Sequence, residues 1–391
     1  MPQTIHPDYA ARVEALAARL DATAIARDRA GGSALHERGL LRESGLLPLS
    51  VPRVYGGQEA PWPLLLHIVR RLAEVDSSLA HLYAFQHLQV ATVLLFACPA
   101  QQERLLRGTQ EHNWFWGNAM NAVNNQAIAT PVDGGFTVSG VKAFCSGATD
   151  SDMLMLSAQR ADGTGLIVAG VPSSRAGIDI RQDWDNMGQR QTDSGTVAFD
   201  KLFIADEEVL GPPGPLSTPR STLRPVLAQL ILVNLYLGIA RGALDSALAH
   251  TRDSGRPWPW SGIEHIEDEP YVLQRYAEYW VDLKAAARLG DDAAEAFQHA
   301  WNAGEALTEA QRGEVAIQVA EAKILATRTG LAITSGIFEQ LGARATAAKL
   351  GFDRYWRNLR THTLHDPLDY KKRDLGRWLL TGDVPKPSFY A

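Results

Sequence analysis

The stretch from Val226 to Ala240 is apolar on every side of a helix, and this feature constrains the fold most strongly. It contains Gln229 and Asn234 and is too short to cross a bilayer. A helix that is apolar all round has to be buried in a protein core. The stretch therefore predicts a buried core helix in a bundle. Because an exposed helix over 226–250 would be costly, we also expect a homo-oligomer.

The spacing of apolar residues divides the chain into three regions. Residues 1–112 show helical periodicity, with Asp76 and the two serines after it as capping residues between two helices. Residues 113–215 hold short β-rich runs separated by Gly, Asp and Asn, which predict an antiparallel β-domain or barrel. After the Gly- and Pro-rich linker 211–215, helical periodicity fills 216–391. The predicted fold class is therefore α+β.

Composition limits the classes of partner. The net charge of −6 gives no reason to expect a nucleic acid or an anionic membrane. The two cysteines, Cys98 and Cys145, are far apart and form no metal or disulfide framework, which fits a reduced, cytoplasmic location. Residues 8–20 are amphipathic and resemble no signal peptide.

One β-rich segment, 136–147, has a pattern that suggests ligand binding. We interpret it as a strand, a tight turn at Ser139-Gly140, a second strand, and a small Ser146-Gly147 step. Ser146 followed by glycine could offer a hydroxyl and a close backbone to a flat ligand. A plain hairpin is the alternative interpretation.

This segment, FTVSGVKAFCSG, resembles the flavin-wrapping segment of the acyl-CoA dehydrogenase superfamily. Four further segments resemble motifs of that superfamily in the same order: 185–195, 237–244, 338–343 and 354–358. The resemblance implies an N-terminal helical domain, a central antiparallel β-domain and a C-terminal four-helix bundle. It also implies a flavin cofactor and a tetramer.

The residues that catalyse acyl-CoA dehydrogenation are incompletely matched. Those enzymes need a carboxylate base beside the flavin. This sequence has Ala228 at one of the two places for it and Asp366 at the other, followed by proline. The loop that seats acyl-CoA is replaced by 117–125. An FAD-dependent acyl-CoA dehydrogenase with Asp366 as base remains an alternative, as does a flavin-binding relative without catalysis.

Two segments instead resemble the flavin monooxygenase branch of the superfamily, near dibenzothiophene monooxygenase and its sulfone-pathway relatives. They are Arg360-Thr-His-Thr-Leu-His-Asp-Pro367 and Arg256-Pro-Trp258. The resemblance implies a two-component FMN-dependent monooxygenase that oxygenates a small nucleophilic, organosulfur substrate through a C4a-hydroperoxyflavin. No GxGxxG nucleotide motif is present, so a separate NAD(P)H:flavin reductase would supply the reduced FMN.

The resemblance also implies the site residues. Five polar residues would surround the reactive edge of the flavin: His87, Asn118, Ser146, His362 and His365. Residues that contact the cofactor would be Phe144, Ser146, Arg256, Gly342, Ala343 and Arg344. The two arginines would hold the FMN phosphate, whose oxygens match a guanidinium. His362 and His365 could share a metal, but no third ligand has recognisable spacing, so no metal site is expected.

Overall fold

A computed structural model describes residues 7–121 and 126–390. Its first region is helical and supports one side of the site. Asp76 begins α4, as the sequence predicts, because its carboxylate accepts hydrogen bonds from the backbone N–H groups of Ser78 and Leu79, both at 3.1 Å. The helices of this region are α1 (Pro7–Ala30), α2 (Leu35–Glu43), α3 (Trp62–Val75), α4 (Ser77–Phe96) and α5 (Pro99–His112), with the short η1 (Arg53–Tyr55).

The central region is a seven-stranded sheet in the order β1-β4-β2-β3-β7-β6, with β5 paired to β4. The predicted β-domain is present, and most of its strand pairs are antiparallel. The pairs of β4 with β1 and with β2 are parallel, so the antiparallel prediction is wrong for these two. The strands are β1 (Trp116–Ala119), β2 (Ala127–Val132), β3 (Gly135–Lys142), β4 (Met153–Arg160), β5 (Leu166–Pro172), β6 (Ile178–Ile180) and β7 (Val197–Ala205).

The predicted turn at Ser139-Gly140 is wrong. Both residues lie inside β3, which pairs with β2 from Gly135 to Gly140 and shifts register against β7 between Val138 and Gly140. Gly140 has φ +122°, and a Cβ there would lie 1.8 Å from the carbonyl oxygen of Gln126. Glycine is needed for this bulge, and a sequence pattern cannot distinguish a bulge from a turn. The hairpin turn is at Asp133-Gly134.

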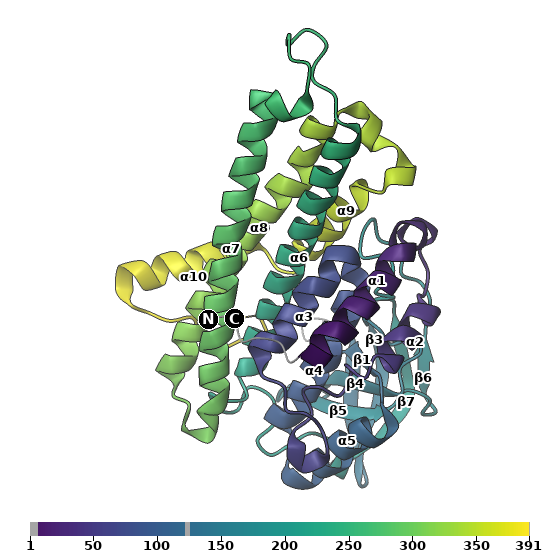
Figure 1. The fold of residues 1–391 in the computed structure, drawn as a ribbon. Helices are drawn as coiled ribbons and strands as arrows, with labels where there is room; N and C mark the ends of the chain where they lie inside the picture. The colour runs from purple at the N-terminus through teal and green to yellow at the C-terminus, as the bar shows by residue number, and fades with distance from the viewer. Residues whose placement is uncertain (1–6, 122–125, 391) are drawn as a thin grey trace.

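The third region consists of long helices that extend beyond the sheet (Figure 1). Its helices are α6 (Leu223–Ser254), α7 (Pro270–Asn302), α8 (Glu309–Leu341), α9 (Asp353–His362) and α10 (Leu368–Thr381). Short 3₁₀ turns, η2 (Asp206–Glu208), η3 (Ile266–Asp268), η4 (Gly304–Ala306), η5 (Ala343–Thr346) and η6 (Ala348–Leu350), connect the elements. By length and composition α4 and α6 could each span a membrane, but 89% and 94% of their most apolar windows are buried inside the protein. Both are core helices, as the sequence predicts for 226–240.

Two glycines allow α6 to approach α3 closely. A Cβ on Gly238 would lie 2.3 Å from the carbonyl oxygen of Arg70, and one on Gly242 would lie 2.0 Å from that of Glu74. The backbones of the two helices therefore touch at successive turns. This contact joins the C-terminal bundle to the N-terminal helices and fixes where α6 begins relative to α4.

We expect Gly242→Ala to separate α3 from α6 and to lower the free energy of unfolding by about 1–3 kcal/mol. Urea denaturation followed by circular dichroism would measure this. The matched control is Gly376→Ala in α10, where an added Cβ meets nothing within 4 Å. That change should be neutral or stabilise by up to about 1 kcal/mol. Equal effects of the two substitutions would contradict the packing argument.

Candidate active site

A cavity of about 560 Å³ lies where the three regions meet. Helices α4, α6 and α9, the loops of the β-domain and the C-terminal segment all contribute to its wall. Five of the predicted site residues line it, and Ala228 lines it as well. These five are Asn118, Phe144, Ser146, His362 and His365.

Helix α4 presents a histidine to the cavity, but not the predicted one. His81, Phe85 and Leu88 line the cavity from one face of the helix, at positions i, i+4 and i+7. His87 lies outside this lining, with Nδ1 2.7 Å from the hydroxyl of Ser50. The structure therefore does not bring His87 together with the other predicted residues. The helical spacing of His81 from Phe85 and Leu88 could have identified it from the sequence.

His81 and His362 form a pair of neutral imidazoles in the cavity wall. Their ring centroids are 5.0 Å apart, and His81 also stacks on Phe85 at 4.0 Å. Burial lowers the pKa of His81 to about 3, with a further contribution from His365. Burial also lowers the pKa of His362 well below its usual value, assisted by the neighbouring His81. Both rings are uncharged at neutral pH, and each offers one donor and one acceptor nitrogen.

These imidazoles retain unused hydrogen-bonding capacity. Within the described chain, neither ring nitrogen of His81 has a partner, and Nδ1 of His362 has none. The backbone of His362 is fixed, because the hydroxyl of Tyr236 donates to its carbonyl oxygen at 2.9 Å. Buried polar atoms without partners are costly, so these nitrogens fit a cavity that receives a polar ligand.

The β-domain supplies the opposite, polar wall. The hydroxyls of Ser146 and Ser194 are 2.7 Å apart, and that of Ser194 is 2.7 Å from the hydroxyl of Thr192. The backbone N–H of Asn118 donates to the carbonyl oxygen of Ser146 at 3.0 Å. The side chain of Asn118 accepts from the amide of Gln89 on α4 at 3.0 Å. Asn118 and Ser146 are therefore held in a fixed relation to α4.

Two aromatic side chains next to this wall lie edge to face, with 74° between their ring planes. Phe144 has φ +60°, and this unusual backbone turns its ring into the lining beside Trp184, at 5.9 Å between ring centroids. The loop that carries Trp184 is anchored from behind, because the backbone N–H of Gln189 donates to the side chain of Asn358 at 2.6 Å. An aromatic ring face beside fixed polar groups suits a planar conjugated ligand.

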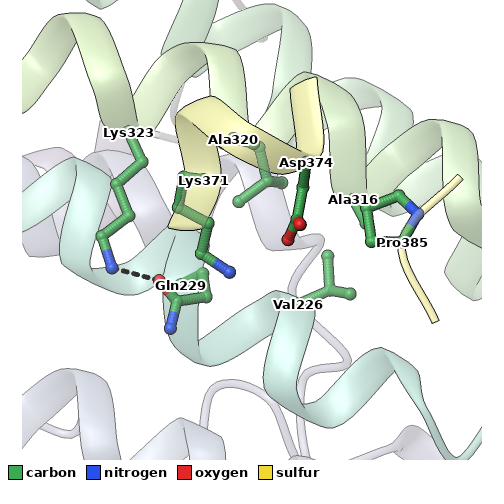
Figure 2. A pocket seen from close by; sticks show the side chains of 9 residues that line it. Val226, Gln229, Ala316, Ala320, Lys323, Lys371, Asp374 and Pro385 are labelled. Atoms are coloured by element: carbon green, nitrogen blue, oxygen red, sulfur yellow. Dashed lines mark hydrogen bonds between the residues drawn. The ribbon is translucent and has the colours of Figure 1, made fainter. Parts of the chain in front are cut away.

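A buried ion pair lies behind His365. The carboxylate of Asp366 accepts from Nδ1 of His365 at 3.0 Å and from the ammonium group of Lys323. Lys323 also donates to Gln229, as Figure 2 shows. Burial alone would raise the pKa of Asp366, but the hydrogen bond from His365 and the charge of Lys323 outweigh it and hold that pKa well below its usual range. Burial lowers the pKa of Lys323 to about 8, against the opposing effect of Asp366.

Asp366 and its neighbour His365 differ in charge and in access to the cavity. Asp366 is an ionised carboxylate whose charge is already paired, and it is not among the residues that line the cavity. His365 donates through Nδ1, so its Nε2 is the nitrogen that can accept or return a proton when the ring is neutral. The sequence did not predict Lys323 as part of the site, because its partner is 43 residues away in the chain.

Four predicted cofactor residues lie far from the cavity of their own chain. Arg256, Gly342, Ala343 and Arg344 are exposed and do not line it. They lie at one end of the bundle, where Arg275 of α7 forms a 2.7 Å ion pair with Glu339 of α8. Because α6 rises 1.5 Å per residue, its C-terminal end lies about 40 Å from Ala228. One chain therefore cannot place Arg256 at its own cavity.

Reduced flavin fits the residues present better than a metal does. The described residues contain no group of three or more His, Cys, Asp or Glu side chains that could hold a metal ion. The cavity combines aromatic side chains, hydroxyls and unpartnered imidazole nitrogens, which suit the apolar body and polar edge of an isoalloxazine ring.

Comparison with known proteins identifies the family. Residues 9–112, 117–202 and 230–370 match the N-terminal, middle and C-terminal domains of acyl-CoA dehydrogenase, respectively. The chain belongs to the acyl-CoA dehydrogenase family. Of the residues 117–125 predicted to replace the acyl-CoA loop, 122–125 lie outside the described residues.

Full-length relatives within this family are flavin-dependent monooxygenases. The chain is 47% identical to the "Probable FMNH2-dependent monooxygenase SfnC" of Pseudomonas putida, over 96% of this chain and 95% of that protein. It superposes on the methanesulfinate monooxygenase MsuC of Pseudomonas fluorescens with a TM-score of 0.97 and 46% identity, covering 99% and 100% of the two chains. TdsC of Paenibacillus sp. A11-2, solved with FMN and indole, superposes with a TM-score of 0.93 and 39% identity, covering 99% of this chain and 100% of that chain. The chain is a flavin-dependent enzyme of this monooxygenase group.

The buried ion pair generates a stability prediction. Lys323→Met should leave Asp366 as an uncompensated buried charge and lower the free energy of unfolding by about 3–5 kcal/mol. The double variant Lys323→Met/Asp366→Asn should recover much of that loss, because no lone charge remains. Urea denaturation at pH 7 would measure both. The control Lys372→Met removes an exposed ion pair with Asp369 and should cost less than about 1 kcal/mol. Additive losses in the double variant would contradict the pairing.

Proposed function

We propose that this protein is the oxygenase of a two-component system: it receives reduced FMN from a separate NAD(P)H:flavin reductase and oxygenates a small organosulfur compound. The observation that carries the proposal is the cavity wall, which contains serine, asparagine and neutral histidine but no carboxylate among the described residues. Support for the cofactor comes from SfnC, which is named as FMNH2-dependent, and from TdsC with bound FMN. Support for the substrate class comes from the methanesulfinate monooxygenase MsuC.

The proposed roles of the residues follow from their positions. Phe144 and Trp184 would hold the flavin ring, with Ser146 and Asn118 at its polar edge. Bound reduced FMN would supply the two electrons that activate O₂. His81 and His362 would donate hydrogen bonds there without adding charge, and apolar neighbours such as Phe85 would exclude water. His365, held through Nδ1, would take or return a proton at Nε2.

The overall reaction balances with the components named. One atom of O₂ is transferred to the sulfur of the substrate, which is oxidised by two electrons. FMNH₂ is oxidised to FMN and provides the other two electrons and two protons, with which the second oxygen atom leaves as water. The oxidised FMN then returns to the reductase.

The acyl-CoA dehydrogenase alternative has less support. It would need Asp366 as a free base facing the substrate. The carboxylate is instead engaged by Lys323 and His365, and it lies outside the cavity lining. A coupled assay decides between the two functions. Oxygenation of an organosulfur compound only when reduced FMN is supplied would support the proposal, whereas acyl-CoA dehydrogenation with tightly bound FAD would overturn it.

For the remaining predicted cofactor residues we propose contact with the flavin of a second copy of the chain. Arg256 cannot reach the cavity of its own chain and Arg344 does not line it, but an oligomer could place both at another cavity. The loop between α6 and α7, which projects from the end of the bundle (Figure 1), carries the exposed Trp258 and Trp260, the latter 81% exposed. Such exposed aromatic residues are typical of interfaces. A homo-oligomer, which we take to be a tetramer, would thus complete the site. A cytoplasmic location remains a prediction.

Ser146→Ala should reduce product formation by about 10- to 100-fold, because one hydrogen-bonding group at the reacting edge is lost. O₂ consumption should persist and shift towards hydrogen peroxide, which a peroxidase-coupled assay would detect. Ser139→Ala is the matched control, since Ser139 is exposed on β3, accepts from the backbone N–H of Lys201 and does not line the cavity. A parallel loss in both variants, or no rise in peroxide, would count against the role of Ser146.

Arg256→Ala and Arg344→Ala should each weaken FMN binding by about tenfold or more, through loss of a charge-assisted phosphate contact. Binding of riboflavin, which lacks the phosphate, should not change. Fluorescence titration would measure both affinities, and light scattering would report the oligomeric state. The control Arg288→Ala removes an exposed arginine of α7 that pairs with Asp292. Unchanged FMN affinity in both variants would refute the proposed phosphate site.

A further inference from the structure

Arg224 is a cation in the cavity wall that the proposed flavin chemistry does not use. It lies in the first turn of α6, is 7% exposed and lines the cavity. Of the described residues that line the cavity, it alone carries a permanent charge, and none is acidic. Burial lowers the pKa of Arg224 to about 10, opposed by the nearby Tyr390, so the guanidinium stays charged at neutral pH.

The charge of Arg224 is uncompensated in the described part of the chain. Its Nε donates to the hydroxyl of Thr92 at 3.0 Å, and no carboxylate there forms an ion pair with it. By contrast, the buried Lys323 is paired with Asp366. Burying a charge without a counterion is expensive. The start of a helix adds positive potential at the same place and makes a cation there still less favourable. Both facts indicate that an anion occupies this end of the cavity.

The position of Arg224 relates the anion to the reacting end of the site. Thr92, its partner, lies one turn of α4 beyond Leu88 and three residues beyond Gln89. Gln89 in turn donates to Asn118, whose backbone is bonded to Ser146. Arg224 is therefore linked, through Thr92, Gln89 and Asn118, to the residues at the proposed reactive edge of the flavin. Tyr390, beside Arg224, also contacts His365, at 5.5 Å between ring centroids.

We propose that Arg224 anchors the substrate through a negatively charged group, and that the substrate is a small sulfinate rather than a neutral sulfur compound. This inference rests on the proposed monooxygenase function. A sulfinate has two oxygens that share one negative charge, which match the free edge of a guanidinium, and a sulfur lone pair that can accept oxygen. The reaction is then RSO₂⁻ + FMNH₂ + O₂ → RSO₃⁻ + FMN + H₂O.

The test measures binding and turnover separately. Ethanesulfinate is titrated into the protein by calorimetry, without flavin and with FMN. Arg224→Met should weaken its binding by about 10- to 100-fold, and the wild-type affinity should fall with added salt. Arg224→Lys should recover part of the affinity, because a lysine keeps the charge but not the two-pronged geometry. Arg220→Met is the control: Arg220 lies four residues earlier, pairs with Glu305 and does not line the cavity.

In turnover with a flavin reductase, ethanesulfinate is compared with ethyl methyl sulfide, a neutral compound of similar size. The ratio of their kcat/KM values should favour the sulfinate and fall by about 10- to 100-fold in Arg224→Met. Unchanged sulfinate binding in that variant would overturn the proposal, as would equal losses for both compounds. If Arg224→Met does not fold, Arg224→Lys carries the same comparison, with a loss of about tenfold expected.

Two further outcomes are separable. The competing anion is the phosphate of FMN; if Arg224→Met weakens FMN binding but not riboflavin binding, that phosphate is the occupant and the substrate anchor is refuted. If sulfinate binding depends on Arg224 but no sulfur compound is oxygenated, the monooxygenase proposal fails and the anion site stands. If oxygenation occurs but sulfinate binding does not depend on Arg224, the monooxygenase proposal stands and the anion site at Arg224 is refuted.

Discussion

The burial of α6 is the constraint on which the other parts of the structure depend. This helix packs against α3 through backbone contacts at Gly238 and Gly242, and its apolar sides are covered by α4, α7 and α8. Because burial fixes the axis of α6, its first two turns lie at the cavity, where Arg224, Ala228 and Gln229 form part of the lining. The same helix then carries its other end about 40 Å away, where Arg256 follows it. One element thus defines both the site and the distance to the residues proposed to serve a neighbouring copy.

In the site, uncharged side chains lie at the proposed reactive edge, and a charged pair lies behind the cavity wall. His81 and His362, the side chains proposed at the reactive edge, are held neutral by burial, whereas the charged groups Lys323 and Asp366 neutralise each other behind the wall. At the proposed reactive edge, uncharged imidazoles and apolar neighbours strengthen each hydrogen bond to an activated oxygen species and exclude water from it, whereas the charge of Arg224 enters the cavity from the start of α6. A base with a free carboxylate would serve proton abstraction, and the described lining contains none. The arrangement is therefore suited to oxygen transfer.

Much of the fold could be predicted from the sequence, because periodicity reports burial directly. The helix–strand–helix order, the capping by Asp76 and the buried helix over 226–240 all follow from local patterns. The parallel pairing of β4 could not be predicted, since it depends on contacts between distant strands. The resemblance predicts Ser146, Asn118, His362 and His365 as site residues, and all four line the cavity. The resemblance predicts His87, whereas the structure places His81 in the lining, on the face of α4 that its spacing from Phe85 and Leu88 defines.

The residues that sequence reasoning missed share a physical reason. Lys323 and Arg224 are unremarkable in sequence, since a lysine or arginine in a helix is usually a solvated side chain. They matter because they are buried, and a buried charge is costly unless a counterion pairs with it. For Lys323 the chain itself supplies the counterion, and the pair positions His365. For Arg224 the described chain supplies only the hydroxyl of Thr92. The proposed anionic ligand would therefore also stabilise the folded site, because it would supply the missing counterion.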